Sequence, residues 1–266
     1  MFSVDCVPSR KKQPYSGGMT WQLVSQSFRL LRADPKLALF PILSALGAIA
    51  LSLPFALIPL TGQEMHWGVG AVVVLAWYLA VSFVTIFCNC ALAACVQMRQ
   101  AGETPSIVAG LRRAGARVHV IFLWALLTST VGRILKGFEQ RSGWTGRIVL
   151  GLIGVSWSLA TFLIVPVLVM EDGGVFDSLR RSAALVRQTW GEQIISGIAF
   201  GWYALLFAIP GVVLGALGAN GYPLFIVPAI LWFAALFAAF TAASEIFAVI
   251  LYREAIGTEL RAGPTC

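Results

Sequence analysis

The chain has 266 residues, of which 58% are hydrophobic and only 12% are charged. Soluble domains have roughly 45–50% apolar and about 25% charged residues, so this composition excludes an ordinary soluble protein and favours an integral membrane protein. The formal net charge is +7, but the basic residues border the apolar runs rather than form one patch, which favours anionic lipid headgroups over nucleic acid as partners.

Six apolar segments are long enough to be membrane-spanning helices, because crossing about 30 Å of hydrocarbon takes about 20 residues. They run from about 37 to 60, 67 to 96, 118 to 135, 148 to 170, 193 to 217 and 224 to 252. The third is the least hydrophobic, with Arg133 and Lys136 at its end, and the sequence leaves open whether it spans fully. Pro41, Pro54 and Pro59 predict a kink or an interruption in the first.

Basic segments with helical periodicity precede the first, third and fifth spans, and we expect each to be an amphipathic helix lying at the membrane interface. In the third of them Asp177 is the expected N-cap. Its apolar face comprises Phe176, Leu179, Ala183, Val186 and Trp190. The expected contacts to anionic lipids from the three helices are Arg29, Arg32, Arg112, Arg113, Arg117, Arg180, Arg181 and Arg187.

The repeated pattern of surface helix and two spans predicts a single helical membrane domain over residues 19–257. Its hairpin units cover about 20–99, 104–170 and 177–252, between a disordered basic N-terminus (1–18) and a tail (258–266). All but four of the 19 Lys and Arg residues fall on the side of the termini. The four exceptions are Arg133, Lys136, Arg141 and Arg147. The positive-inside rule therefore predicts cytoplasmic termini and cytoplasmic surface helices.

Glu245 is the best single candidate for a functional residue, because a carboxylate inside an apolar segment is costly unless it is paired, protonated or hydrated. The alternative is a hydrogen-bonded structural glutamate. Asn89 in the second segment is a candidate polar partner. Pro166, Pro210 and Pro228 are typical of discontinuous helices around a transport site, but prolines are also common in membrane helices that bind no substrate.

Two GxxxG spacings, Gly197 with Gly201 and Gly211 with Gly215, predict close packing between the fifth and sixth helices. The alternative is a contact between two copies of the chain.

The sequence gives little support for catalysis or for a metal site. His66 and His119 are predicted on opposite sides of the membrane, and no hydrolase or phosphate-binding motif is present. The adjacent acidic residues Glu171 and Asp172 are explained by turn solvation and helix-end electrostatics. Three cysteines in one apolar run are expected to be buried thiols rather than metal ligands. They are Cys88, Cys90 and Cys95. We expect no enzyme activity and no cofactor.

Several short runs carry a family resemblance. They are Pro166-Val-Leu-Val-Met-Glu171, Asp177-Ser-Leu-Arg-Arg-Ser182, Trp190-Gly191-Glu192-Gln193 and, before the first span, Trp21, Ser27, Leu30 and Asp34-Pro35. With these the chain resembles a bacterial family of uncharacterised multi-helix membrane proteins, related to the membrane domain attached to some glycerophosphodiester phosphodiesterases. The resemblance implies a helical domain with cytoplasmic interfacial helices in a bacterial inner membrane, and it carries over no catalytic residue.

The sequence therefore predicts an all-α polytopic membrane protein with six transmembrane helices and about three cytoplasmic interfacial helices. The functional hypothesis is a non-catalytic scaffold or lipid-organising module that contacts anionic lipids. The alternative is a transporter or channel for a small solute or ion that uses Glu245, Asn89 and the proline-interrupted helices. A second copy of the chain or another membrane protein is a further expected partner.

Overall fold

The computed structural model describes residues 17–57, 67–141, 143–220 and 222–262. Within these ranges the chain forms α-helices and short 3-10 helices and contains no strand. In chain order they are α1 (Gly17–Ala33), η1 (Pro35–Ala38), α2 (Leu39–Leu57), α3 (Trp67–Gln100), α4 (Ile107–Ala116), α5 (Val118–Arg141), α6 (Trp144–Ala160), α7 (Ile164–Met170), α8 (Val175–Ala219), η3 (Pro223–Phe225) and α9 (Ile226–Ala262).

Six helical stretches of the described chain are long and apolar enough to cross a membrane. They are Pro35–Phe55, Gly68–Gln100, Val118–Phe138, Trp144–Met170, Phe200–Ala219 and Pro223–Gly257. The prediction of an all-α polytopic fold is confirmed. The third stretch, on α5, reaches 21 residues, so it is long enough to span.

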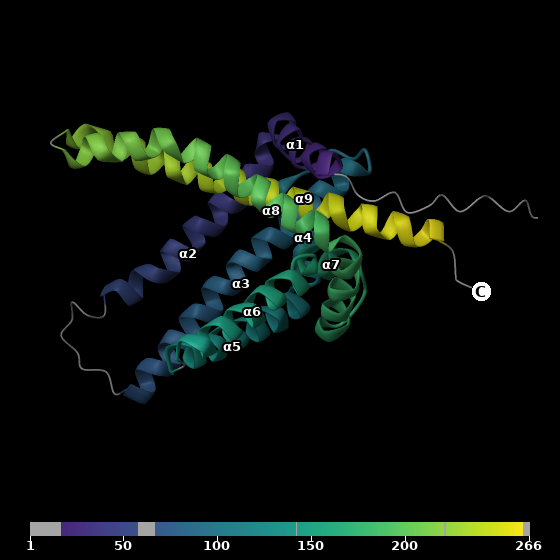
Figure 1. The fold of residues 1–266 in the computed structure, drawn as a ribbon, viewed down its shortest axis with the longest axis horizontal. Coiled ribbons are helices and arrows are strands. Elements are labelled where there is room, and N and C mark those ends of the chain that lie inside the picture. Colours follow the sequence, from purple (N-terminus) through teal and green to yellow (C-terminus); the bar gives the residue numbers. More distant parts are fainter. Residues whose placement is uncertain (1–16, 58–66, 142, 221, 263–266) are drawn as a thin grey trace, which may run out of the picture.

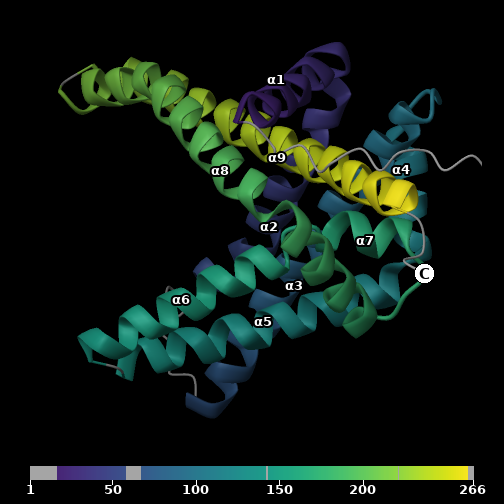
Figure 2. The same cartoon turned by 45° about the vertical axis from the view of Figure 1, so that its right-hand side comes forward.

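The helices are gathered at one end and diverge towards the other. α1, α4, α7, the start of α8 and the end of α9 meet at what we call the basic end (Figure 1). From there the α8–α9 hairpin separates from α3, α5 and α6 towards the opposite, distal end, which is clearest in Figure 2. The largest fully buried side chains, such as Phe40, Leu92, Ile121, Leu168 and Leu251, belong to the basic end. The core therefore lies there, while the distal helices expose apolar side chains as lipid-facing helices do.

The predicted span 148–170 is interrupted close to Pro166, one of the three prolines that the sequence analysis described as typical of discontinuous helices. α6 ends at Ala160 and α7 begins at Ile164. The break places Pro166 in the first turn of α7, where its missing N–H is not needed, whereas a continuous helix would have required it. The Ser182 hydroxyl of α8 donates a hydrogen bond to the Ala160 carbonyl at 2.7 Å, so a carbonyl next to the break is satisfied from a neighbouring helix.

The other prolines do not break their helices. α2 continues past Pro54 and α8 past Pro210, and Pro228 lies in the first turn of α9. The first span, for which the sequence predicted a kink or an interruption, is therefore not interrupted over Leu39–Leu57, and Pro59 lies outside the described residues.

The third predicted surface helix is not a separate element. It forms the first turns of α8, which continues for 45 residues into the fifth span. No proline occurs in its first 35 residues, and a glycine such as Gly191 costs a helix only about 1 kcal/mol. The N-cap is Gly174 rather than Asp177, because the helix begins at Val175. Asp177 lies in the first turn, where its negative charge interacts favourably with the helix dipole.

The ends of the domain differ in part from the prediction. α1 and α4 are separate helices, as expected for the first two amphipathic segments. The N-terminus expected to be disordered lies outside the described residues up to position 16. α9 continues through the start of the expected tail to Ala262.

Candidate functional site

Asn89 of α3 and Glu245 of α9 meet where these helices cross inside the apolar region. The Asn89 amide nitrogen Nδ2 donates a hydrogen bond to Glu245 Oε1 at 3.0 Å. Both residues are half-buried, and their neighbours Cys90, Ile246 and Phe247 are buried. The structure thus brings together two polar candidates that the sequence could identify only separately.

This pair retains an unfilled acceptor. Asn89 Oδ1 is buried and has no hydrogen-bond partner, and no described residue forms an ion pair with Glu245. A carboxyl group in an apolar region is stabilised by a proton, a cation or water. The pair therefore offers a carboxyl group that can carry a proton and a free amide oxygen that can accept a hydrogen bond, between α3 and α9.

The cysteines of α3 form no metal centre in the described part of the chain. Cys88, Cys90 and Cys95 are buried free thiols, and Cys95 Sγ lies 3.4 Å from the Ser106 carbonyl as a hydrogen-bond donor. Among the described residues no group of three or more Cys, His, Asp or Glu side chains is placed to hold a metal ion. Cys95 therefore contributes to packing between α3 and α4.

A cluster of polar side chains, which we call the polar clamp, joins the helices at the basic end. It consists of Arg117, Glu171, Asp172, Arg181 and Tyr252. Glu171 Oε1 accepts hydrogen bonds from Arg181 Nε at 3.1 Å and from the Tyr252 hydroxyl at 2.9 Å. Arg117 Nη2 lies 2.7 Å from Asp172 Oδ1 and also donates to the Glu171 carbonyl. The clamp thereby connects the α4–α5 junction, the α7–α8 turn, α8 and α9.

The sequence analysis missed this role of Glu171 and Asp172, which it explained as a solvated turn. Asp172 is exposed, but the Glu171 side chain is only 30% exposed. One signal was available: with 12 acidic residues against 19 Lys and Arg, an acidic pair between two apolar helices is a natural partner for arginine.

The structure divides the eight arginines predicted to contact lipid into two groups. Arg117 and Arg181 belong to the clamp, with side chains 18% and 33% exposed, and Arg113 pairs with Glu103 at 3.4 Å. The other five are exposed and form no ion pair with a described residue. They are Arg29 and Arg32 of α1, Arg112 of α4, and Arg180 and Arg187 of α8.

The two GxxxG motifs lie in different surroundings. A Cβ added at Gly211 would lie 2.7 Å from Trp232 of α9, and one at Gly215 would lie 4.0 Å from the nearest α9 side chain. Gly201 is exposed, and an added Cβ there would meet no atom within 4 Å. Gly197 lies outside the residues whose surroundings are described. The second motif therefore packs the α8–α9 hairpin, whereas the Cβ position of Gly201 faces open space among the described residues.

Gly110 is a packing position that the sequence did not single out. A Cβ there would lie 2.5 Å from Cys95 Sγ and 2.7 Å from the Ala91 carbonyl oxygen. Only glycine lets α4 approach α3 this closely. The periodicity of α4 predicted a helix but could not predict its distance from α3.

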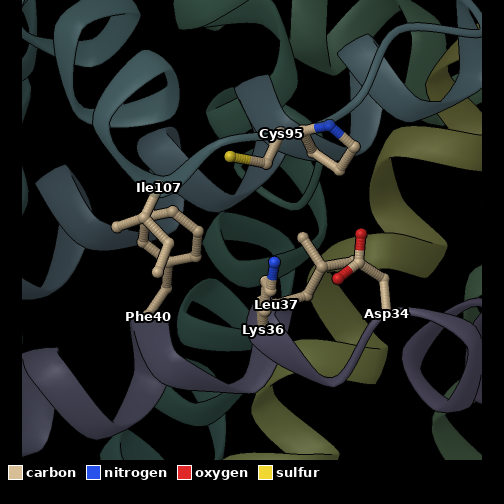
Figure 3. Close-up of a pocket in the computed structure, with 7 residues that line it drawn as sticks. Asp34, Lys36, Leu37, Phe40, Cys95 and Ile107 are labelled. Carbon is tan, nitrogen blue, oxygen red and sulfur yellow. The ribbon is translucent and has the colours of Figure 1, made fainter.

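A shallow pocket opens beside this contact (Figure 3). It is lined by Asp34, Lys36, Leu37, Phe40, Cys95, Pro105 and Ile107, and its empty volume of about 170 Å³ includes open solvent. Cys95 lies on the wall opposite Asp34 and Lys36. Pockets for small molecules usually have about 300–1,000 Å³, so we assign no ligand here.

Together these features define a polytopic α-helical membrane protein, held by polar contacts at its basic end and carrying one amide–carboxyl pair inside the apolar region. Comparison of the sequence with protein families gives a more specific result. The chain belongs to DUF6159, a family of unknown function, whose model matches residues 68–255. No curated protein and no solved structure matches the chain.

Proposed function

We propose that this protein is a non-catalytic integral membrane protein that binds and organises anionic lipids through its basic end. The observation that carries the proposal is the set of five exposed arginines without ion-pair partners among the described residues, on α1, α4 and α8. Each Lys or Arg near an anionic surface contributes about 1 kcal/mol of attraction. Because the five lie on three helices near the ends of the spans, they place exposed positive charge at the basic end.

A neutralised variant tests this proposal. In it Arg29, Arg32, Arg112 and Arg180 are replaced by Gln, which leaves the clamp arginines intact. The variant and the wild type are reconstituted in nanodiscs of phosphatidylglycerol and phosphatidylcholine, and the retained lipids are counted by native mass spectrometry. We expect the preference for phosphatidylglycerol to fall at least tenfold. An unchanged preference in the folded variant contradicts the proposal.

A matched control removes positive charge from the distal end. Arg147→Gln replaces an exposed cation of α6 away from the basic end. This control should change the lipid preference less than twofold, because Arg147 does not belong to the five arginines of the basic end.

We further propose that the protein lies in a bacterial cytoplasmic membrane with the basic end and both termini in the cytoplasm. The distribution of Lys and Arg supports this orientation. The bacterial setting extends the expectation from the sequence resemblance, because the family match itself gives only a family of unknown function. A C-terminal green fluorescent protein fusion should fluoresce and an alkaline phosphatase fusion should be inactive. The reverse pattern refutes the orientation.

Ion or small-solute transport is the second candidate function. It is favoured by the Asn89–Glu245 hydrogen bond with its unfilled Asn89 acceptor. In a variant whose other cysteines are replaced, Glu245→Cys should react with an aqueous thiol reagent if water reaches the pair. Ala242→Cys, one turn earlier at a buried position, is the matched control. Equal protection of both cysteines contradicts the transport function.

A further inference from the structure

Arg133 of α5 lies towards the distal end, and none of the contacts described above involves it. Its Nη2 donates a hydrogen bond to the Val74 carbonyl of α3 at 3.0 Å. Its guanidinium carbon Cζ lies 5.1 Å from the centroid of the Tyr78 ring. No described residue forms an ion pair with it. A carbonyl and an aromatic ring therefore hold this cation in place, and the described part of the chain provides no counter-charge.

One donor of Arg133 is unfilled. Its Nε is buried and has no hydrogen-bond partner. Leaving a buried donor of a charged group unpaired is more costly than leaving a neutral one, so an acceptor is expected. A guanidinium presents its N–H groups in a planar fork that matches the oxygens of a phosphate or carboxylate.

The depth of Arg133 identifies the acceptor. The α3 span continues beyond Tyr78 to Gly68, whereas the α5 span ends at Phe138. Arg133 lies five residues, about 7.5 Å along the helix, before that end, so its long side chain reaches the distal headgroup level. The Tyr78 ring lies against it, and tyrosines are common at that level. The anion present there at high density is the lipid phosphate.

We propose that Arg133 and Tyr78 bind the phosphate group of a phospholipid headgroup in the distal leaflet. A phosphate oxygen accepts hydrogen bonds from the planar guanidinium group of Arg133. The Tyr78 hydroxyl, 3.7 Å from the Cβ position of Gly132, is a second donor at the same site. Lys136, exposed and one turn further along α5, adds positive charge. The exposed side chain of Ile134 leaves room for an acyl chain alongside α5.

The test uses a phospholipid without net charge, so that it is independent of the anionic preference proposed for the basic end. Delipidated wild-type protein in micelles is titrated with phosphatidylethanolamine, and bound lipid is measured by native mass spectrometry. The parallel titrations use diacylglycerol with the same acyl chains and inorganic phosphate. We expect tight binding of the phospholipid only, with a rise in unfolding temperature that diacylglycerol does not produce.

Substitutions locate the site. Arg133→Gln and Arg133→Lys should each weaken phosphatidylethanolamine binding about tenfold, because both remove the planar guanidinium group, although the lysine keeps the charge. Arg147→Gln, an exposed distal cation on α6, should change it less than twofold. Because Arg133 also contacts α3, each variant is checked for a folded state by circular dichroism, and the wild-type comparison of phospholipid with diacylglycerol needs no variant.

Three results would overturn the proposal. One is wild-type lipid binding by folded Arg133→Gln and Arg133→Lys. Another is diacylglycerol binding as tight as that of the phospholipid. The third is displacement of the lipid by millimolar inorganic phosphate, which would identify a site for the free anion instead. The basic-end variant should lose its preference for anionic lipid but keep its phosphatidylethanolamine binding. This result would show that the Arg133 site is independent of the basic end.

Discussion

Replacing Glu171 by Ala should destabilise the protein through the polar clamp. The substitution removes the acceptor for Arg181 Nε and for the Tyr252 hydroxyl. The side chains of Glu171 and Arg181 are 30% and 33% exposed, so solvent screening limits the stabilisation from their ion pair to about 1 kcal/mol. Tyr252 is only 4% exposed, so its hydrogen bond to a charged acceptor should stabilise the fold by about 1.5 kcal/mol. The free energy of unfolding should therefore fall by about 2.5 kcal/mol.

A double-mutant cycle with Tyr252→Phe measures how much of this loss of stability comes from the hydrogen bond of the Tyr252 hydroxyl. Unfolding is followed by circular dichroism during titration with sodium dodecyl sulfate in mixed micelles. Tyr252→Phe alone should cost about 1.5 kcal/mol. The double variant should be no less stable than Glu171→Ala, which corresponds to a coupling free energy of about 1.5 kcal/mol.

Glu103→Ala is the matched control, because its carboxylate also pairs with an arginine but is 56% exposed. It should cost less than about 0.5 kcal/mol. The reasoning is refuted if Glu171→Ala is no more destabilising than this control, or if the effects of Glu171→Ala and Tyr252→Phe are additive.

Three further predictions concern packing and the intramembrane pair. Gly110→Ala should lower the free energy of unfolding by about 1–3 kcal/mol, because the new methyl group would lie 2.5 Å from a sulfur and 2.7 Å from a carbonyl oxygen. Gly115→Ala is the control in the same helix. It should leave stability unchanged or raise it, because nothing lies within 4 Å of the added methyl group. Ser182→Ala should cost about 1 kcal/mol by leaving the last α6 carbonyl without its donor, whereas Ser156→Ala, exposed and bonded within its own helix, should cost less. Asn89→Leu should cost roughly 0.6–2 kcal/mol, the range for polar contacts between membrane helices, and an unchanged unfolding midpoint would show that its hydrogen bond to α9 is not stabilising.

The spans could be predicted from the sequence because a membrane helix requires only a long apolar run. The position of the break between α6 and α7 could not be predicted, although Pro166, which causes it, is evident in the sequence. Pro54 and Pro210 lie in helices that remain continuous, so a proline alone does not decide. At the break, Ser182 satisfies a carbonyl next to it, and a contact with another helix is not readable from local sequence.

The candidate site shows the same limit at longer range. Glu245 and Asn89 were conspicuous because polar residues are rare in apolar runs, but they are 156 residues apart in the chain. Their hydrogen bond depends on how α3 crosses α9. Glu171 was not conspicuous, because an acidic residue in a turn has a simple local explanation. Its partner Tyr252 is 81 residues away, and only the assembled basic end gives the pair its role.

Helix α9 links the intramembrane pair to the basic end. Glu245 and Tyr252 are two helical turns apart and lie on the same face, so one contacts α3 and the other contacts the α7–α8 turn. A third contact, from Arg253 to Gln100 at 2.9 Å, fixes α9 against the end of α3. Lipid provides little hydrophobic drive for helix association, so such polar contacts set the position of α9 along its axis. The distal half of α9 has no comparable contact to α3 among the described residues, which explains why the α8–α9 hairpin diverges there while the basic end stays closed.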